Sequence, residues 1–349
     1  MKKIAFMMVF AGLLAACSGN SSQDEPATNN DITTVKKDAS YAVLLESDVR
    51  YGDGLSHDDN STIPFSTPLH LDIYAPDNGA LNRPVYLFIH GGGFTGGSKT
   101  AEHIVEMATY FAARGWVFVS INYRTTQNLG ALSADNLDEA LTFYQGIAPE
   151  EWINFALDGA ETESDFKQAI ALYTAQRDAK AALRWIMANA ERYSIDTNYV
   201  TVGGGSAGAI TALALGVTDE DDFRDEISLV DDPTLATTNL NATTRVKSLV
   251  HFWGSNVKLE LFEAVYGEYP YDSTDPELFM AHGTDDINPS TPFSEATELE
   301  AIFNANGIYN ALIPLEGAGH GAWGATANGK TLAELSFDFL IERQQLNVE

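Results

Sequence analysis

Ser206 is the side chain of this sequence whose setting best suits a nucleophile. It stands in the stretch Gly-Gly-Ser-Ala-Gly at 204–208, after the largely β-branched run 199–202 and before the apolar helical run 210–215. Glycines two residues before and after the serine allow a sharp turn from strand to helix that exposes the hydroxyl. Because a free hydroxyl is a weak nucleophile, this motif predicts catalysis only if a base, an orienting acid and oxyanion donors occur elsewhere.

Oxyanion donors are predicted upstream, where the apolar run 84–89 leads into the sequence His-Gly-Gly-Gly at 90–93. Successive glycines let backbone N–H groups approach a developing alkoxide, and each donor is typically worth roughly 10²–10³ in kcat. We expect the N–H groups of Gly92, Gly93 and Ala207 to be these donors. A glycine-rich turn or a phosphate cradle is the alternative, but neither GxGxxG nor GxxxxGK[ST] is matched here.

The acid and the base are expected after the serine, in that order and each in a loop that follows a strand. The short apolar run 277–281 ends in a turn that carries two carboxylates, Asp285 and Asp286, of which only one can face a histidine. His320 follows the last predicted strand and is flanked by small residues that leave its ring room to reach Ser206. Three other histidines precede the nucleophile outside the glycine-rich loop (His57, His70, His103), and two are expected to be core histidines (His251, His282).

Together these motifs resemble the α/β-hydrolase superfamily, and within it the HGGG-bearing esterases close to the hormone-sensitive-lipase-like and BD-FAE-like carbohydrate or feruloyl esterases. The resemblance spans most of residues 41–349 and includes the segments 71–76, 121–124 and 178–185. It implies that Asp286 rather than Asp285 is the acid and that His90 is structural. The chain departs from many relatives in Gly208-Ala209 after the serine-alanine pair and in a much longer stretch after Arg124.

Alternating strand and helix patterns predict a mostly parallel eight-stranded sheet flanked by helices, as in the α/β-hydrolase fold. An apolar stripe predicts a core helix over 175–192. An insertion at about 125–173 is rich in aromatic residues, which argues for a small helical cap over the serine or for a peripheral packing element. The predicted strands lie near 41–47, 69–75, 84–89, 116–122, 199–203, 246–252, 277–281 and 309–313.

The first residues of the chain predict where the protein is located in the cell. Lys2 and Lys3 precede a short apolar run and a lipobox-like end at Cys17, the only cysteine. This pattern predicts a lipoprotein signal peptide over 1–16, lipid attachment at Cys17 and a flexible tether over 17–40, with the catalytic domain at 41–349. The expected location is the bacterial cell envelope, where the lipid anchor alone attaches the protein to a membrane, expected to be the outer membrane. Ordinary secretion with a chance cysteine is the alternative.

Charge narrows the range of partners. The 349 residues carry 20 basic and 49 acidic side chains, a net charge of −29. Such an acidic chain is not expected to bind nucleic acid, and neutral esters are easier substrates for it than anionic polymers. The acidic run 219–222 lacks the ligand spacing of a calcium loop, so a solvated loop is expected there and no metal is predicted.

The predicted chemistry is that of a serine carboxylic-ester hydrolase that works through an acyl-serine. Ser206 attacks, His320 is the base and Asp286 orients it. The expected substrates are short-chain or carbohydrate-linked esters such as acetyl or feruloyl esters, and the reaction needs no cofactor. An amide or peptide hydrolase of the same fold and a non-catalytic binding protein on this scaffold are the alternatives.

Overall fold

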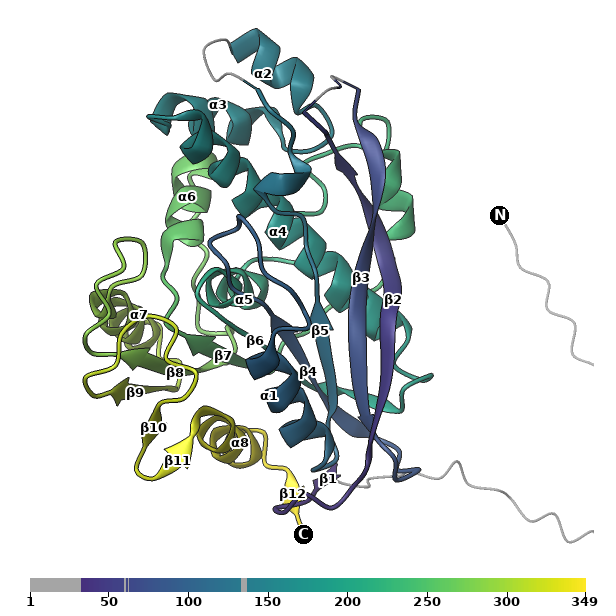
Figure 1. Cartoon of the computed structure of the whole chain (residues 1–349), viewed down its shortest axis with the longest axis vertical. Helices are drawn as coiled ribbons and strands as arrows, with labels where there is room; N and C mark the ends of the chain where they lie inside the picture. The colour runs from purple at the N-terminus through teal and green to yellow at the C-terminus, as the bar shows by residue number, and fades with distance from the viewer. Residues whose placement is uncertain (1–32, 60, 62, 133–136) are drawn as a thin grey trace, which may run out of the picture. The chain divides into compact units, whose positions relative to one another are not determined.

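A sheet of eight strands forms the centre of the folded unit, in the order β2-β3-β5-β4-β6-β7-β8-β9 (Figure 1). The computed structural model describes residues 33–59, 61, 63–132 and 137–349. Strand β3 pairs antiparallel with β2 and β5, and the other pairs are parallel, which confirms the mostly parallel sheet. The strands are β2 (Val43–Ser56), β3 (Phe65–Pro76), β4 (Arg83–Ile89), β5 (Val117–Ile121), β6 (Ile195–Gly205), β7 (Ser248–Phe252), β8 (Glu277–Gly283) and β9 (Asn310–Leu315).

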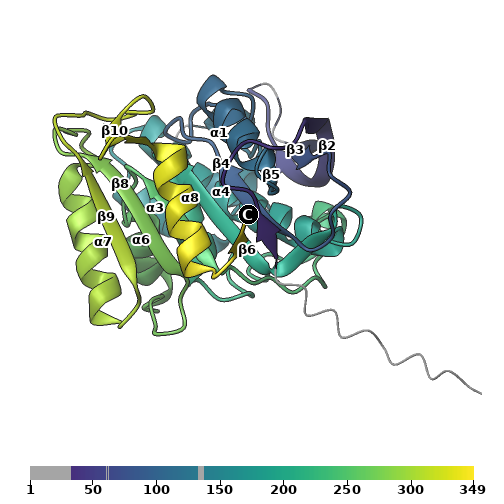
Figure 2. The same ribbon diagram turned by 90° about the horizontal axis from the view of Figure 1, so that it is seen from below.

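Both faces of the sheet are buried because successive side chains of a strand point to opposite sides. In β4, Val85, Leu87 and Ile89 join one apolar cluster, whereas Tyr86 and Phe88 join a second. Helices α1 and α8 supply the second cluster, and Figure 2 shows α8 alongside the strands that it covers. Helices α2 to α7 supply the first. The helices are α1 (Glu102–Ala112), α2 (Leu137–Phe143), α3 (Glu150–Gly159), α4 (Glu163–Ala188), α5 (Ala207–Val217), α6 (Val257–Tyr266), α7 (Phe293–Ala305) and α8 (Leu332–Arg343).

Short elements complete the unit. Two 3₁₀ turns, η1 (Thr126–Asn128) and η2 (Pro233–Thr237), lie in connections, and β10 (Thr326–Ala327) pairs with β11 (Lys330–Thr331). Strand β1 (Thr34–Val35) pairs in parallel with β12 (Asn347–Val348), and Val35 is buried in the second cluster. The folded unit therefore begins before residue 41, earlier than the tether prediction of 17–40 allowed. Cys17 and the predicted signal peptide lie outside the described residues.

Helix α4 starts well before the predicted helix 175–192 and ends sooner, at Ala188. Its start is set by a capping box, in which Thr162 accepts from the Asp165 N–H and Asp165 accepts from the Thr162 N–H. The apolar stripe does not reach this start, because the first residues of α4, Glu163 to Asp165, are polar and exposed. Further along α4, polar side chains are buried and paired. The Arg184 side chain donates to the Thr238 carbonyl at 3.0 Å, and the Lys180 ammonium donates to the Asp222 carbonyl at 2.8 Å.

A buried ion pair joins α4 to the end of β5. Arg124 and Asp178 are both 2% exposed, and the guanidinium donates to both carboxylate oxygens at 2.7–3.1 Å. The Arg124 N–H also donates to this carboxylate at 2.8 Å, and its Nη1 donates to the Leu55 carbonyl at 2.7 Å. This pair explains why the segments 121–124 and 178–185 occur together, because each supplies one charge to a site that excludes water.

None of the helices in the described part of the chain is long and apolar enough to cross a membrane. The insertion is helical, as the sequence predicts, and consists of η1, α2, α3 and the first part of α4. Five of its aromatic residues are buried in the first apolar cluster: Phe143, Tyr144, Trp152, Phe166 and Tyr173. Phe155 is exposed.

We expect Asp178→Ala to destabilise the folded unit by about 3–5 kcal/mol, because it leaves the Arg124 charge buried without its partner. Urea unfolding followed by tryptophan fluorescence measures this loss. The matched control is Asp338→Ala, which removes the exposed pair with Lys330, 50% and 47% exposed, and should change the free energy of unfolding by less than about 1 kcal/mol. Equal effects of the two substitutions would contradict this account.

Candidate active site

Ser206 lies between β6 and α5, where the chain reverses direction within one residue. Its backbone has φ 55° and ψ −125°, a conformation that residues other than glycine rarely adopt. The Ser206 N–H donates to the Phe252 carbonyl at 2.9 Å, which ties the turn to β7. Gly208 is required by close packing, because a Cβ there would overlap the Ile89 carbonyl oxygen at the end of β4. The structure thus contains the sharp strand-to-helix turn that the sequence predicts.

A chain of hydrogen bonds connects Ser206 to two of the other predicted residues. Ser206 Oγ and His320 Nε2 are 2.9 Å apart, and His320 Nδ1 lies 2.8 Å from Asp286 Oδ2. The Asp286 side chain is fully buried, whereas His320 is 28% exposed and can contact a substrate. The imidazole therefore carries its proton on Nδ1, facing the carboxylate, and presents an unprotonated Nε2 to the serine.

The alternative acid, Asp285, points elsewhere. Its side chain is exposed, and its hydrogen bond within the described residues runs from the Thr284 hydroxyl at 3.4 Å. Backbone bonds fix the turn, since the Asp285 N–H donates to the Ala318 carbonyl at 3.0 Å and the Asp286 N–H donates to the Gly283 carbonyl at 3.2 Å. Two adjacent carboxylates on such a turn face different ways, and Asp286 faces inward.

The predicted oxyanion donors converge beside Ser206. Gly92 and Gly93 have φ of 120° and 59°, which glycine adopts without strain, and Gly92 has no room for a Cβ against the Gly96 carbonyl. Gly91, Gly92 and Gly93 line one cavity with Ser206 and His320. No acceptor among the described residues takes the N–H groups of Gly92 or Gly93. Ala207 is the first residue of α5, so its N–H is one of the four that a helix leaves unpaired.

The carbonyl oxygens of the oxyanion loop, residues 90–97, accept hydrogen bonds from the chain that follows β5. The Tyr123 hydroxyl donates to the His90 carbonyl at 2.9 Å, and the Gln168 amide of α4 donates to the Gly93 carbonyl at 2.7 Å. Two donors from η1 act likewise: the Thr126 N–H on Phe94 at 2.9 Å and the Gln127 amide on Thr95 at 3.0 Å. These bonds hold the loop on both sides of Gly92 and Gly93, the residues whose N–H groups are the predicted oxyanion donors.

The insertion does not form the aromatic cap over Ser206 that was one of the two expectations for it. None of the aromatic residues of the insertion lines the cavities beside Ser206, and all except the exposed Phe155 lie in the core. The first turn of the insertion, η1, binds the oxyanion loop, and four residues of its last part, in α4, line a cavity next to the serine: Asp165, Gln168, Ala169 and Leu172. The insertion is thus partly a packing element and partly a wall of the site, because α4 begins inside it and continues into the core.

Two cavities meet at Ser206. The first, of about 480 Å³, has the oxyanion loop on one side and the aromatic side chains of His103, Trp253 and Trp323 on the other. His103 stacks on Trp323 with ring centroids 4.0 Å apart, and Trp253 meets Trp323 edge-on at 4.6 Å. The second cavity, of about 340 Å³, lies between α4, α5 and α6 and is lined mainly by apolar side chains: Phe94, Leu172, Ile210, Val257 and Leu261.

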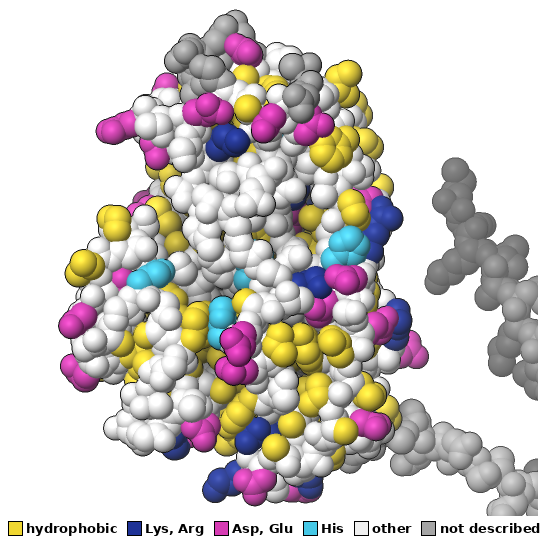
Figure 3. Space-filling model, viewed as in Figure 1, with side chains coloured by type: hydrophobic (Ala, Val, Ile, Leu, Met, Phe, Trp, Pro, Cys, Tyr) yellow, Lys and Arg dark blue, Asp and Glu magenta, His cyan; other side chains and the backbone are white. Residues whose placement is uncertain are grey.

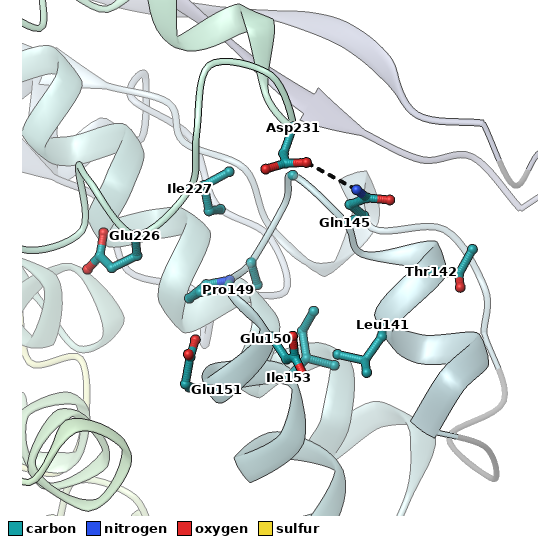
Figure 4. Close-up of a pocket in the computed structure, with 12 residues that line it drawn as sticks. Leu141, Thr142, Gln145, Pro149, Glu150, Glu151, Ile153, Glu226, Ile227 and Asp231 are labelled. Carbon is teal, nitrogen blue, oxygen red and sulfur yellow. Dashed lines mark hydrogen bonds between the residues drawn. The ribbon is translucent and has the colours of Figure 1, made fainter.

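A further cavity, of about 500 Å³, lies apart from these residues, between α2, α3 and the segment 226–231 (Figure 4). None of the predicted site residues lines it. Its described polar groups are partly paired with one another, and the Gln145 amide donates to Asp231 at 3.1 Å. Its walls include Glu150, Glu151 and Glu226, which make this region acidic. Figure 3 shows acidic side chains around the end of the folded unit that carries α2 and α3.

Buried histidines surround the site in their neutral form. Burial lowers the pKa of His90 to about 4 and that of His251 to about 3. His90 Nδ1 lies 2.7 Å from the Gly91 carbonyl, and its ring stacks on Tyr123 at 4.3 Å. His90 therefore occupies a structural place in the oxyanion loop, as the resemblance implies.

Sequence reasoning missed several residues of the site. Tyr123 stands in the segment that carried the resemblance, but its bond to the oxyanion loop is a tertiary contact. Gln168 and Thr291 have no local pattern that would single them out; the Thr291 hydroxyl lies 3.1 Å from His320 Nδ1. His282 is buried, as expected of a core histidine, yet its Nε2 also lies 3.0 Å from Asp286 Oδ2.

The sheet order, the turn at Ser206 and the serine-histidine-aspartate chain define an α/β hydrolase. Comparison with known families agrees with this class. The chain belongs to the BD-FAE family, whose profile matches residues 71–145 and 164–264, half of the sequence. The two matched ranges contain the oxyanion loop, Ser206 and the helix that carries Asp178.

Individual relatives are distant. The chain is 27% identical over 147 residues to a para-nitrobenzyl esterase of Bacillus subtilis and 32% identical over 151 residues to a fumonisin B1 esterase of Sphingopyxis macrogoltabida. These segments cover 42% and 43% of this chain but only 24% and 23% of the relatives. A propionate-bound thermophilic esterase from Thermogutta terrifontis has the same fold, with a TM-score of 0.54 at 20% identity over 84% of this chain and 96% of that one.

We expect a fluorophosphonate probe to label the wild-type protein, because His320 can accept the Ser206 proton as the serine oxygen attacks the probe. Ser206→Ala should abolish the label, as measured by in-gel fluorescence. The control is Ser98→Ala, which removes another hydroxyl that lines the same cavity and should keep the label. Labelling that survives Ser206→Ala would assign the reactive group elsewhere.

Proposed function

We propose that this chain is a serine carboxylic-ester hydrolase that acts through an acyl-serine. The observation that carries the proposal is the hydrogen-bonded chain from Ser206 through His320 to Asp286, at 2.9 and 2.8 Å, beside backbone N–H groups without an acceptor in the described structure. The family membership and the esterase relatives support the same activity. Ser206, His320 and Asp286 are the proposed catalytic triad.

In the first half-reaction, Ser206 Oγ attacks the ester carbonyl carbon while its proton moves to His320 Nε2. The electron pair of the C=O π bond moves to the oxygen, which the N–H groups of Gly92, Gly93 and Ala207 receive. Asp286 stabilises the imidazolium that forms. When the tetrahedral intermediate collapses, the bond to the alcohol oxygen breaks, and this oxygen takes the proton from His320 Nε2.

In the second half-reaction, water replaces the alcohol. His320 Nε2 takes a proton from the water as its oxygen attacks the acyl carbon, and the oxyanion forms again at the same N–H groups. Collapse breaks the bond to Ser206 Oγ, which recovers a proton from His320. The products are the carboxylic acid and the free enzyme. The original Ser206 proton leaves with the alcohol, and a proton from water replaces it.

The two cavities support short-chain or carbohydrate-linked esters as substrates. The apolar cavity of about 340 Å³, which has α4 as one wall, suits a small apolar group on one side of the scissile bond. The larger cavity has aromatic walls, on which a sugar or an aromatic ring can stack. The strongly acidic chain favours neutral substrates over anionic ones.

A panel of p-nitrophenyl esters tests the activity and its acyl range. We expect kcat/KM to fall by about tenfold or more from the butyrate to the dodecanoate ester, because the small apolar cavity cannot hold a long chain without rearrangement. Acetyl-xylan and methyl ferulate are measured beside them, with Ser206→Ala as the control. Turnover of amides or peptides without ester turnover would instead favour an amide hydrolase. A wild-type protein that hydrolyses none of these esters, amides or peptides would contradict the proposal.

The oxyanion loop offers a second test through Gln168. We expect Gln168→Met to lower kcat by about tenfold, because the Gly93 carbonyl loses its donor and the N–H groups of the loop are held less firmly. Inhibition by a trifluoromethyl ketone, which forms the oxyanion on Ser206, should weaken in parallel. Lys167→Met, one residue earlier on α4 and outside the cavity lining, is the matched control. A change in KM alone would show that Gln168 is only a wall of the cavity.

A further inference from the structure

The Asp286 carboxylate has more donors than a catalytic triad requires. Oδ2 accepts from two imidazoles, His320 Nδ1 at 2.8 Å and His282 Nε2 at 3.0 Å, and Oδ1 accepts from the Asn288 N–H at 2.9 Å. The Asp286 side chain is fully buried, so these bonds replace the water that an exposed carboxylate would have. One of these donors, His282, has no part in the mechanism described above.

The contacts of His282 determine where its proton lies. Nε2 faces two groups that can only accept, the Asp286 carboxylate at 3.0 Å and the Thr291 carbonyl at 3.1 Å. Nδ1 is buried and has no partner among the described residues. The side chain is 1% exposed, and burial lowers the pKa of His282, so the ring is neutral at neutral pH. A neutral ring in this setting must carry its single proton on Nε2.

The neighbours of His282 come from four elements. Asp286 belongs to the turn that follows its own strand, β8, and His320 to the loop after β9. His251, at the end of β7, is the third titratable group that acts on it. Phe293 of α7 meets the His282 ring edge-on at 5.8 Å. The Asp286 carboxylate is the charged partner of His282 among these groups, because burial keeps His251 neutral.

We propose that His282 is a positioning residue of the active site, which fixes the Asp286 carboxylate and takes up part of its negative charge. The proposal rests on the proposed triad and deepens it. A carboxylate held by His282 and by the Asn288 N–H cannot rotate away from His320, so the imidazole keeps its orientation toward Ser206. Because Oδ2 is shared between two N–H donors, it attracts the His320 proton less strongly than a carboxylate bound to His320 alone.

Two measurable consequences follow from removing this donor with His282→Phe, which keeps a buried ring. Plateau kcat should fall by about tenfold, since a freer carboxylate orients His320 less well. The acidic limb of the kcat/KM profile should move to higher pH by roughly half a unit or more, because the unshared charge stabilises the imidazolium that must lose its proton before catalysis. For the wild type we expect kcat/KM to rise from mildly acidic to neutral pH, because a histidine must be neutral to act as a base.

The experiment compares pH profiles for p-nitrophenyl acetate among four proteins: wild type, His282→Phe, His282→Gln and His251→Gln. Gln can place an amide N–H near the position of Nε2, so His282→Gln should restore most of the wild-type profile. His251→Gln alters a neighbouring buried histidine that does not contact Asp286 and should leave the profile unchanged. The folded fraction is measured by thermal unfolding and by fluorophosphonate titration of Ser206 at pH 8.

The outcomes separate this proposal from the proposed function. If the wild type hydrolyses no ester and takes no label, the proposed function fails. If the wild type is active but folded His282→Phe has the same kcat and profile, or if Phe and Gln lower activity alike without moving the limb, the positioning role is overturned. Should the variants not fold, ¹⁵N NMR of the wild-type histidines decides: a proton on His282 Nδ1 overturns the proposal, and one on Nε2 supports it.

Discussion

The reversal of the chain at Ser206 is the constraint on which the rest of the site depends. A single residue in the left-handed region costs of order 1–3 kcal/mol and persists only where packing enforces it. Here the packing is the contact of α5 with the end of β4, where Gly208 lies against the Ile89 carbonyl with no room for a side chain. This contact sets the first turn of α5 beside the glycine-rich loop that follows β4. One close approach thus exposes the serine and gathers the oxyanion donors around it.

The chain between β5 and β6 contributes to this geometry from behind. Its buried ion pair, Arg124 with Asp178, and its core aromatics make α4 a rigid support. From this support, Gln168 and the short turn η1 bind the carbonyl side of the oxyanion loop. A loop rich in glycine has many conformations available to it. The insertion restricts that freedom, and its helix α4 also forms one wall of the apolar cavity.

Around Asp286 the protein handles a buried charge by surrounding it with donors. A carboxylate removed from water is costly unless hydrogen bonds replace its solvation. The turn after β8 supplies one backbone N–H, and β8 and the loop after β9 each bring an imidazole N–H. Burial lowers the pKa of His282, so its neutral ring solvates the carboxylate without adding positive charge. His320, more exposed, is the imidazole free to exchange protons with the serine and a substrate.

Local patterns in the sequence were enough for the parts whose chemistry depends on neighbouring residues. The glycines around Ser206, the run 90–93 and the parallel sheet follow from turn geometry and periodicity, whereas the order of serine, acid and histidine was expected from the chain order of α/β hydrolases. The choice between Asp285 and Asp286 required a family resemblance, because adjacent carboxylates on one turn look alike in sequence. The true start of α4 was not predicted, because its first turn is polar and exposed and continues no apolar stripe. The contacts of Gln168, Thr291 and His282 join segments far apart in the chain, and no local pattern records which segments will meet.

The residue types near the serine limit which reactions are possible, and the sequence alone determines these types. The three-dimensional packing of β4, α4, β8 and the loops after β8 and β9 decides where each donor lies. Hydrogen bonds depend on distances between atoms, and the linear order of residues does not contain these distances.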